Sequence, residues 1–246
     1  MDVLAGKGAV VTGGSRGIGR AVVERLARDG AAVTFSYLRD EQAAGDVVRS
    51  VTQAGGKAWA LRADQGDVSD LVALFDAAEL NSGGLDIVVN NASIIAVGPI
   101  ADTSDHDWDQ VMTVNAKGTF VCIREAARRL RDGGRIVNIS SINTVMPEAG
   151  ISLYAASKGA IEQLSAVAAH ELGDRQITVN TVSPGATDTD LLRGANSADD
   201  LAALPGMSPL GRIGQPADVA DVVAFLAGPD GRWMTGQNLR AGGGIR

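Results

Sequence analysis

Short segments rich in β-branched residues alternate with longer segments of helical periodicity along the whole chain, and this alternation restricts the fold more than any other feature. The short segments are apolar on both faces, as strands are in a parallel sheet covered by helices on both sides. No linker, repeat or low-complexity segment interrupts the alternation. We therefore predict a single α/β domain, residues 1–246, built on a doubly wound parallel sheet.

The same pattern gives the expected elements. Strands are predicted at Lys7–Gly13, Ala31–Tyr37, Lys57–Ala63, Leu85–Asn91, Gly134–Ser140, Ile177–Ser183 and Gln237–Arg240. Helices are predicted at Ile18–Asp29, Glu41–Ala54, Ser69–Leu80, His106–Arg131, Tyr154–Leu172 and Ala217–Leu226. Each of the first six strands is thus followed by a helix before the next strand begins.

Composition argues against several classes of protein. The net charge of −7 is opposite in sign to the basic face of a nucleic-acid-binding protein. No apolar run approaches the roughly 20 residues of a membrane span, and the amino terminus does not resemble a signal peptide. We expect a cytoplasmic protein that binds neither nucleic acids nor membranes.

Few residues could bind a metal or form a disulfide. The single cysteine, Cys122, lies in an apolar helical segment and is expected to be a buried core residue. His106 and His170 have no Cys, His or carboxylate at ligand spacing, so no metal site is predicted.

A glycine-rich turn, TGGSRGIG, follows the first predicted strand and opens the first helix. Glycines let the backbone turn sharply beside a pyrophosphate, and the helix amino end offers free N–H groups to an anion. The turn therefore predicts a dinucleotide-binding loop. The expected contacts in this loop are Gly13, Ser15, Arg16, Gly17, Ile18 and Gly19.

The end of the second strand suggests which dinucleotide is bound. In NAD-binding folds an acid at this point holds the ribose 2′-hydroxyl. Here the strand ends at Tyr37, and the one nearby acid, Asp40, lies beyond it in what resembles a helix cap. Arg16 and Arg39 could instead bracket a 2′-phosphate with charge-assisted hydrogen bonds. We therefore predict NADP(H), with NAD(H) as the alternative.

The region 184–215 has no clear period and follows directly on the sixth strand. Doubly wound folds bind their ligands at this carboxyl edge of the sheet. We interpret the region as a substrate lid, with a variable surface loop as the alternative.

The segment YAASKGA places Tyr154 and Lys158 one helical turn apart, so that both side chains share one face. By itself this spacing also fits the solvated face of an ordinary helix. Further motifs follow the family order of the short-chain dehydrogenases/reductases, which the whole chain resembles. They are TGGSRGIG, NNAS (Asn90–Ser93), VNAKG around Asn115, NISS (Asn138–Ser141), YAASK and PGATDTD.

The resemblance implies a seven-stranded Rossmann sheet and a catalytic group made of Asn115, Ser141, Tyr154 and Lys158. Ser141 is preferred over its neighbour because it stands thirteen residues before Tyr154, as the family's catalytic serine usually does. Family members pack the helices equivalent to REAARRLRDGGR at subunit contacts, so a homotetramer, or a homodimer, is expected.

These residues suit the reduction of a ketone, which needs a hydride on carbon and a proton on oxygen. Free tyrosine has a pKa of about 10. The Lys158 cation, together with the positive charge of the oxidised nicotinamide, is expected to lower the pKa of Tyr154. Ser141 can donate to the carbonyl oxygen. The resemblance also implies that Asn115 holds a water linked to Lys158, and that Lys158 binds the nicotinamide ribose.

The family pattern extends the cofactor site. Its further expected contacts are Tyr37, Asp64, Gln65, Asn91, Ala92, Val114, Pro184, Gly185, Thr187 and Thr189, besides Tyr154 and Lys158. The sequence departs from the family twice. Ser93 replaces a usual glycine, and the tail RAGGGI lacks the polar residue that often precedes the last two glycines.

The expected substrate surface is mostly apolar. It comprises Ile94, Ile95, Asn143, Met146, Leu191, Leu192 and Met207, with Ser141 and Tyr154 at the reacting carbonyl. We predict an NADP(H)-dependent reductase of a hydrophobic ketone such as a 3-oxoacyl thioester. The alternatives are a reductase of polyhydroxynaphthalenes or other polyketides and, from a different class, a catalytically silent NADP-binding regulator.

Overall fold

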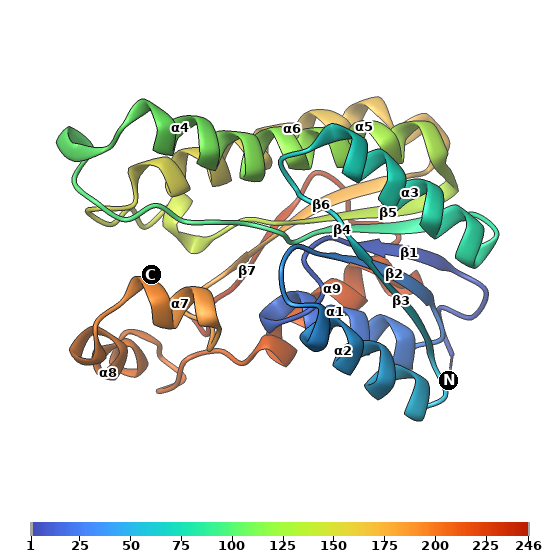
Figure 1. Ribbon diagram of the computed structural model, residues 1–246, viewed down its shortest axis with the longest axis horizontal. Coiled ribbons are helices and arrows are strands. Elements are labelled where there is room, and N and C mark those ends of the chain that lie inside the picture. The colour runs from blue at the N-terminus through green and yellow to red at the C-terminus, as the bar shows by residue number, and fades with distance from the viewer. Residues whose placement is uncertain (1, 246) are drawn as a thin grey trace.

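A seven-stranded sheet lies at the centre of the computed structural model, which describes residues 2–245 (Figure 1). The strand order is β3-β2-β1-β4-β5-β6-β7, and every pair of neighbours is parallel. The strands are β1 (Gly8–Val11), β2 (Ala32–Tyr37), β3 (Lys57–Arg62), β4 (Leu85–Asn90), β5 (Leu130–Ile139), β6 (Thr178–Pro184) and β7 (Asn238–Ala241). This arrangement confirms the predicted doubly wound fold.

Helices cover both faces of the sheet, with α1, α2 and α9 on one side and α3, α5 and α6 on the other (Figure 1). The α-helices are α1 (Gly17–Arg28), α2 (Glu41–Gln53), α3 (Val68–Ser82), α4 (Asp105–Val111), α5 (Gly118–Arg129), α6 (Ser152–Glu171), α7 (Asp190–Ala195), α8 (Ala198–Met207) and α9 (Pro216–Ala227). Short 3-10 turns are η1 (Ile100–Asp102), η3 (Ile142–Thr144), η4 (Gly173–Arg175) and η5 (Pro229–Gly231).

The long helix predicted at His106–Arg131 is not a single α-helix. A π-helical segment, η2 (Met112–Lys117), separates α4 from α5, and the segment from Leu130 onward already belongs to β5. Sequence periodicity could not reveal this, because one extra residue in a turn hardly changes the hydrophobic pattern. Asn115 lies inside the π-helical segment.

The region 184–215, in which the sequence shows no clear period, contains two short helices, α7 and α8. Thr189 caps α7 and Ser197 caps α8 through their hydroxyls. Neither helix has a buried residue, which explains why no hydrophobic period marks them in the sequence. Both lie beside the layers of the sheet, at the end where β6 finishes (Figure 1).

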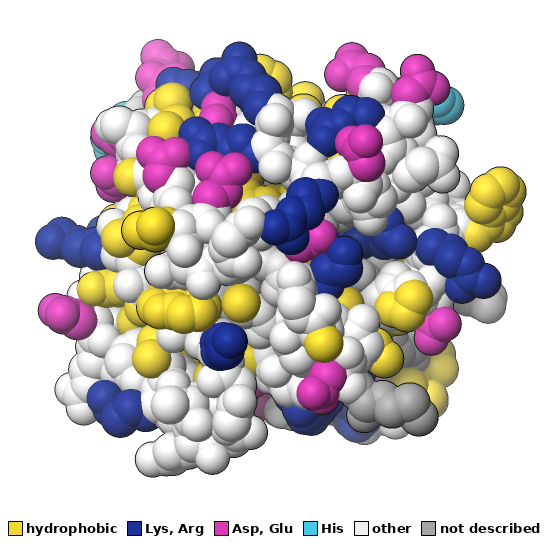
Figure 2. Space-filling view, turned by 90° about the vertical axis from the view of Figure 1, so that its right-hand side faces the viewer, with side chains coloured by type: hydrophobic (Ala, Val, Ile, Leu, Met, Phe, Trp, Pro, Cys, Tyr) yellow, Lys and Arg dark blue, Asp and Glu magenta, His cyan; other side chains and the backbone are white. Residues whose placement is uncertain are grey.

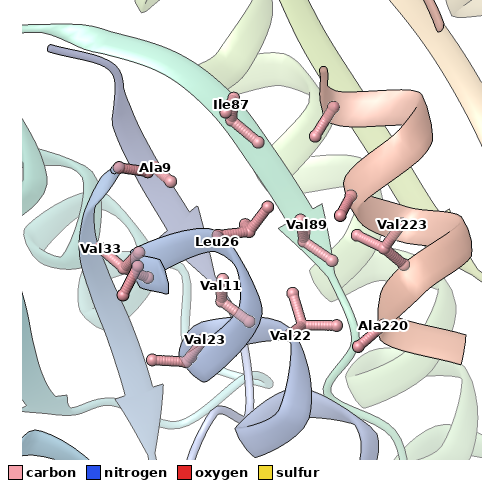
Figure 3. Packing of buried hydrophobic residues seen from close by; sticks show 14 of the residues in the cluster. Ala9, Val11, Val22, Val23, Leu26, Val33, Ile87, Val89, Ala220 and Val223 are labelled. Atoms are coloured by element: carbon pink, nitrogen blue, oxygen red, sulfur yellow. The ribbon is translucent and has the colours of Figure 1, made fainter. Parts of the chain in front are cut away.

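The core between α1, α9 and the sheet consists mainly of small aliphatic side chains. Val22 and Leu26 of α1 pack with Val89 of β4 and Val223 of α9 (Figure 3). Because these residues are short, the helices lie close to the strands. Two Phe residues, Phe35 and Phe75, are the largest fully buried side chains, one on each side of the sheet.

Ion pairs tie the amino ends of the central strands together. The buried Asp86 of β4 accepts hydrogen bonds from Lys7 (2.9 Å), the Gly8 amide (3.0 Å) and Arg131 (3.1 Å).

Positive and negative side chains are interspersed on the side of the molecule that faces right in Figure 1 (Figure 2). Among residues 2–245, no helix combines the length and apolar character needed to cross a membrane.

Candidate active site

A cavity of about 1000 Å³ runs along the carboxyl edge of the sheet. Strand order reverses between β1 and β4, so the loops that follow them diverge to opposite faces and open a crevice there. The glycine loop borders one part of the cavity, and α7 and α8 border another. Its volume is at the upper end of the range for ligand pockets and suits a dinucleotide with a small substrate.

The glycine loop has the geometry of a phosphate cradle. Gly17 has a φ of +53°, and a side chain there would approach Thr189 within 3.2 Å. A Cβ at Gly19 would collide with the carbonyl oxygen of Gly13. No side chain caps the amino end of α1, and its first turn contains no acid. The backbone N–H groups of this turn are therefore available to an anion.

Asn91 shapes this loop as well as lining the cavity. Its side-chain amide donates to the carbonyl oxygens of Thr12 (3.0 Å) and Gly13 (3.1 Å). The Thr12 hydroxyl accepts from the amides of Asn91 and Ala92, at 3.0 Å each. Ser36 accepts from the amide of Gly13 at 3.0 Å. Thr12 and Ser36 were not among the predicted site residues, although Thr12 begins the TGG motif.

The two arginines predicted to hold a 2′-phosphate both line one end of the cavity. Arg16 is largely exposed, and its guanidinium lies 3.7 Å from Asp190 of α7. Arg39 is exposed and has no ion pair within residues 2–245. Asp40 caps α2 by accepting from the amide of Ala43 at 2.8 Å, as its position suggested. The acid that follows β2 is thus engaged in a helix cap.

Asp64, Gln65 and Val114 also line the cavity. The Asp64 carboxylate accepts from the amide of Gly66 at 2.8 Å. Gln65 is buried, and its side chain packs closely against Gly118 of α5. The side-chain orientation of Gln65 leaves its backbone as the part that can face an adenine.

Of the four expected catalytic residues, Asn115 is the most deeply enclosed. Its amide nitrogen donates to the Ile94 carbonyl (2.9 Å) and the Ser157 hydroxyl (3.0 Å), and its oxygen accepts from the Ile94 amide (2.9 Å). Both amide hydrogens are therefore bound to protein groups. One lone pair of the side-chain oxygen remains for the water that the resemblance implies. The side chain also fixes Ile94, an expected substrate contact.

Ser141 and Tyr154 lie side by side at the cavity wall. Ser141 caps η3 and donates its hydroxyl to Asn143 at 2.8 Å. Burial raises the pKa of Tyr154, and the neighbouring Ser141 hydroxyl acts in the opposite direction. The lowering of the pKa expected from the charge of the oxidised nicotinamide would act against this effect of burial. The protein's own groups thus hold the phenol in its protonated form.

Lys158, the expected charge partner of Tyr154, is itself desolvated. It is buried, its Nζ donates to the carbonyl oxygen of Ile139 at 2.9 Å, and it lies 5.5 Å from the centre of the Tyr154 ring. Burial lowers the pKa of Lys158 to about 7. At neutral pH the lysine is therefore only partly charged, and it stabilises a phenolate less than a full cation would.

The predicted lid and substrate residues lie mostly on the cavity. They are Ile94, Ile95, Asn143, Pro184, Gly185, Thr187, Thr189, Leu191, Leu192 and Met207, and Ser93, at which the sequence departs from the family, lines it too. Met146 is not among the lining residues, and Glu148, Ala149 and Ile151 take its place. Asn196, Asp200 and Leu204, which lie within the predicted lid region 184–215, also line this end. Ile245 lines it without having been predicted, since no sequence pattern indicates the position of this segment relative to the sheet.

Cys122 is buried as predicted, and burial raises the pKa of its thiol to about 12. It therefore packs as a core residue rather than reacting as a thiolate. Within residues 2–245, no group of three or more His, Cys, Asp or Glu side chains is arranged to hold a metal ion.

Comparison with known proteins reveals similarity along the whole chain. A family described as enoyl-(acyl carrier protein) reductase matches residues 13–246. The crystal structure of a dehydrogenase/reductase from Sinorhizobium meliloti 1021 superposes with a TM-score of 0.95 at 46% identity, covering 99% of this chain and 96% of that one.

Two further relatives have more specific names. The angucycline C-6 ketoreductase LanV, with bound NADP, superposes with a TM-score of 0.93 at 40% identity over 98% of this chain and 96% of its own. A probable tetrahydroxynaphthalene reductase of Zymoseptoria tritici is 40% identical over 248 residues, which are 95% of this chain and 92% of that protein.

Replacement of the buried lysine gives a test of its electrostatics. In the unfolded chain this lysine has a pKa of about 10.5, whereas burial lowers its pKa in the folded protein to about 7. Between these two pH values the unfolded chain binds more protons, so the stability of the wild-type protein rises with pH. Lys158→Met removes this cost and should raise the free energy of unfolding by roughly 2–4 kcal/mol at pH 6, with a smaller gain at pH 9.5. Urea unfolding at both pH values measures this.

The exposed Lys57 provides the control, since Lys57→Met should change stability equally at both pH values. A gain for Lys158→Met that did not depend on pH would show that the folded protein keeps this lysine charged up to pH 9.5, so that burial does not lower its pKa.

Proposed function

The chain belongs to the short-chain dehydrogenase/reductase family, and we propose that it reduces a hydrophobic ketone to a secondary alcohol with NADPH. One observation carries this proposal. Ser141, Tyr154 and Lys158 meet on the wall of the same cavity that the glycine loop borders. A hydride donor and a proton donor can therefore act on one carbonyl group.

In the proposed reaction, NADPH supplies the hydride that adds to the carbonyl carbon. The Ser141 hydroxyl donates a hydrogen bond to the carbonyl oxygen and stabilises the negative charge that develops there. Tyr154 gives its phenolic proton to this oxygen. Because burial keeps the phenol protonated, it is ready to act as an acid in the direction of reduction. Lys158 favours the phenolate formed, and its partial charge at neutral pH allows proton exchange.

We assign NADP(H) rather than NAD(H) as the cofactor on two grounds. Arg16 and Arg39 lie at the end of the cavity that β2 borders, and Asp40 is engaged in capping α2. In addition, the similar ketoreductase LanV has bound NADP. Two guanidiniums can pair with a 2′-phosphate, which the ribose of NAD lacks.

The substrate end of the cavity favours a neutral ketone. Among the described residues, the two segments that form this end, 143–151 and 186–207, contribute the carboxylates Glu148, Asp190 and Asp200 to the lining but no Lys or Arg. Asp190 is paired with Arg193 and lies close to Arg16, whereas Glu148 and Asp200 form no ion pair within residues 2–245. Hydrogen bonds from Ser197 lower the pKa of Asp200, which keeps this carboxylate ionised. Thioester carriers such as coenzyme A are anionic and would be repelled.

We therefore rank the ketones differently from the order predicted from sequence. A neutral cyclic or aromatic polyketide ketone comes first, in line with the names of the similar LanV and tetrahydroxynaphthalene reductase. The 3-oxoacyl thioester becomes the alternative. The polar Asn143, Asn196 and Glu148 could accept hydrogen bonds from substrate hydroxyl groups.

We also propose that the chain forms a homotetramer. Large apolar side chains are exposed on several helices, including Trp108 of α4 (48%), Phe120 of α5 (45%) and Phe225 of α9 (41%), and Trp233 is 95% exposed. Exposed aromatic residues of this kind are typical of subunit interfaces. Light scattering should give about four times the mass of one chain. A particle of one chain mass would contradict the proposal.

The activity is tested by following NADPH consumption with two ketones in parallel, a bulky aromatic polyketide-like ketone and an acetoacetyl thioester. We expect at least about tenfold higher kcat/KM for the aromatic ketone, because charge repulsion weakens thioester binding. Tyr154→Phe should lower kcat by about 10²–10⁴-fold, since the proton donor is lost.

Reduction of either ketone would support the proposed NADPH-dependent ketone reduction. A higher kcat/KM for the thioester would reverse the proposed ranking of the two substrates. If NADPH bound tightly but no ketone were consumed, the silent regulator would become the better description.

The cofactor assignment is tested by Arg39→Asp. The change should lower the ratio of NADPH to NADH catalytic efficiency by about 100-fold, because it removes an ion pair with the 2′-phosphate and adds a repulsive charge. Arg49→Asp makes the same change of charge on the exposed surface of α2, away from the cavity, and should leave the ratio unchanged. An unchanged ratio for Arg39→Asp would rule out the assigned role.

A further inference from the structure

Glu162 is a carboxylate that the proposed reaction does not use, one helical turn beyond Lys158 on α6. Its Oε1 accepts hydrogen bonds from the hydroxyls of Ser140 (2.8 Å) and Thr144 (2.8 Å), and the Ser183 hydroxyl lies 3.4 Å from it. Within the described part of the chain, no Lys or Arg forms an ion pair with it. Three hydroxyls, from two separate segments, thus surround a single carboxylate oxygen.

Two of these hydroxyls flank Ser141. Ser140 immediately precedes it, and the Thr144 hydroxyl also lies 3.0 Å from the Ser141 carbonyl oxygen. The third hydroxyl, that of Ser183 on β6, donates to Asn238 of β7 at 2.8 Å. Glu162 therefore binds side chains on both sides of the residue proposed to bind the carbonyl oxygen, and it lies close to Ser183 of the next strand.

The segment 140–146 has few other side-chain links to α6. The Ser141 hydroxyl bonds to Asn143 within the segment and lies beside Tyr154 of α6. Among residues 2–245, the other side-chain hydrogen bonds from 140–146 to α6 are those of Ser140 and Thr144 with Glu162 and a 3.3 Å contact of Ser140 with the Lys158 carbonyl. Apart from the reacting groups themselves, Glu162 thus provides most of the side-chain hydrogen bonds that join the segment to this helix.

The energetics of this arrangement also argue for a specific role. A partly buried carboxylate without a cation loses hydration, and its hydroxyl donors compensate for this only in part. An apolar side chain could pack between α6 and β5 without that cost. Such a side chain would not, however, give Ser140 and Thr144 a hydrogen-bond acceptor in a fixed position. That position matters because catalytic groups lose efficiency when they are displaced by about 1 Å.

We propose that Glu162 is a positioning residue, which holds the Ser141 segment in register with Tyr154 and Lys158. It acts through Ser140 and Thr144 and does not line the cavity itself. The proposal rests on the proposed function for its kinetic consequence, but its structural consequence can be measured without any substrate.

The experiment compares Glu162→Ala and Glu162→Gln with wild type and with a control, Glu171→Ala, which removes an exposed glutamate from the same helix. Hydrogen exchange of the amides of residues 143–146 reports on the segment directly, since these amides bond to Ser141 and Ile142. Kinetics with the preferred ketone give kcat and KM, and NADPH binding is measured separately by fluorescence titration.

Glu162→Ala should accelerate exchange of these amides about tenfold or more, while exchange in the central strands stays unchanged. It should lower kcat about 10–100-fold and alter NADPH affinity less than about threefold. Glu162→Gln keeps an acceptor oxygen at the same place and should stay within about threefold of wild type in both measurements. Glu171→Ala should behave like wild type.

Unchanged exchange at residues 143–146 in Glu162→Ala would overturn the proposal. So would equal impairment of the Gln and Ala variants, or acceleration of exchange throughout the sheet, which would indicate a general loss of stability. If wild type reduced no ketone, the proposed function would fail, while the exchange measurements would still decide the role of Glu162.

Discussion

All seven strands run parallel, and this single constraint determines where everything else in the molecule can act. Parallel strands end at the same edge, so the residues that follow β1, β4, β5 and β6 meet although they are far apart in the chain. The reversal of strand order between β1 and β4 opens a crevice at that edge. The glycine loop after β1, Asn91 after β4 and Ser141 after β5 all border it.

The same edge contains polar groups that are costly to bury. Lys158 is enclosed, with its pKa lowered to about 7, and Asn115 has both amide hydrogens bound inside the protein. Glu162 is partly buried without a cationic partner. The apolar core of short aliphatic residues provides the stability that offsets these costs, and the amino edge, held by Asp86, contributes ion pairs away from the site. The ion pairs of Asp86 and the buried polar groups of the candidate active site thus lie at opposite ends of the strands.

Local patterns in the sequence predicted the strands and their parallel arrangement, and the family resemblance supplied most of the cavity residues. The π-helical segment around Asn115 was missed because one extra residue in a turn hardly changes the hydrophobic pattern. The roles of Thr12 and Ser36 in holding the glycine loop were missed because they depend on contacts between segments distant in sequence. The protein groups around Tyr154 raise its pKa through burial, and the lowering expected from the oxidised nicotinamide stays a prediction.

By itself, the sequence determined which residue types were available and where the chain turns. Period and β-branching fixed the alternation of strands and helices, glycines fixed the phosphate loop, and the spacing of Tyr154 and Lys158 put them on one helix face. Only the tertiary structure decided the state of those groups. Desolvation of Lys158, the hydroxyl contacts of Glu162 and the acidic lining of the substrate end arise when separate segments pack together, because burial and charge depend on distance in space and not on order along the chain.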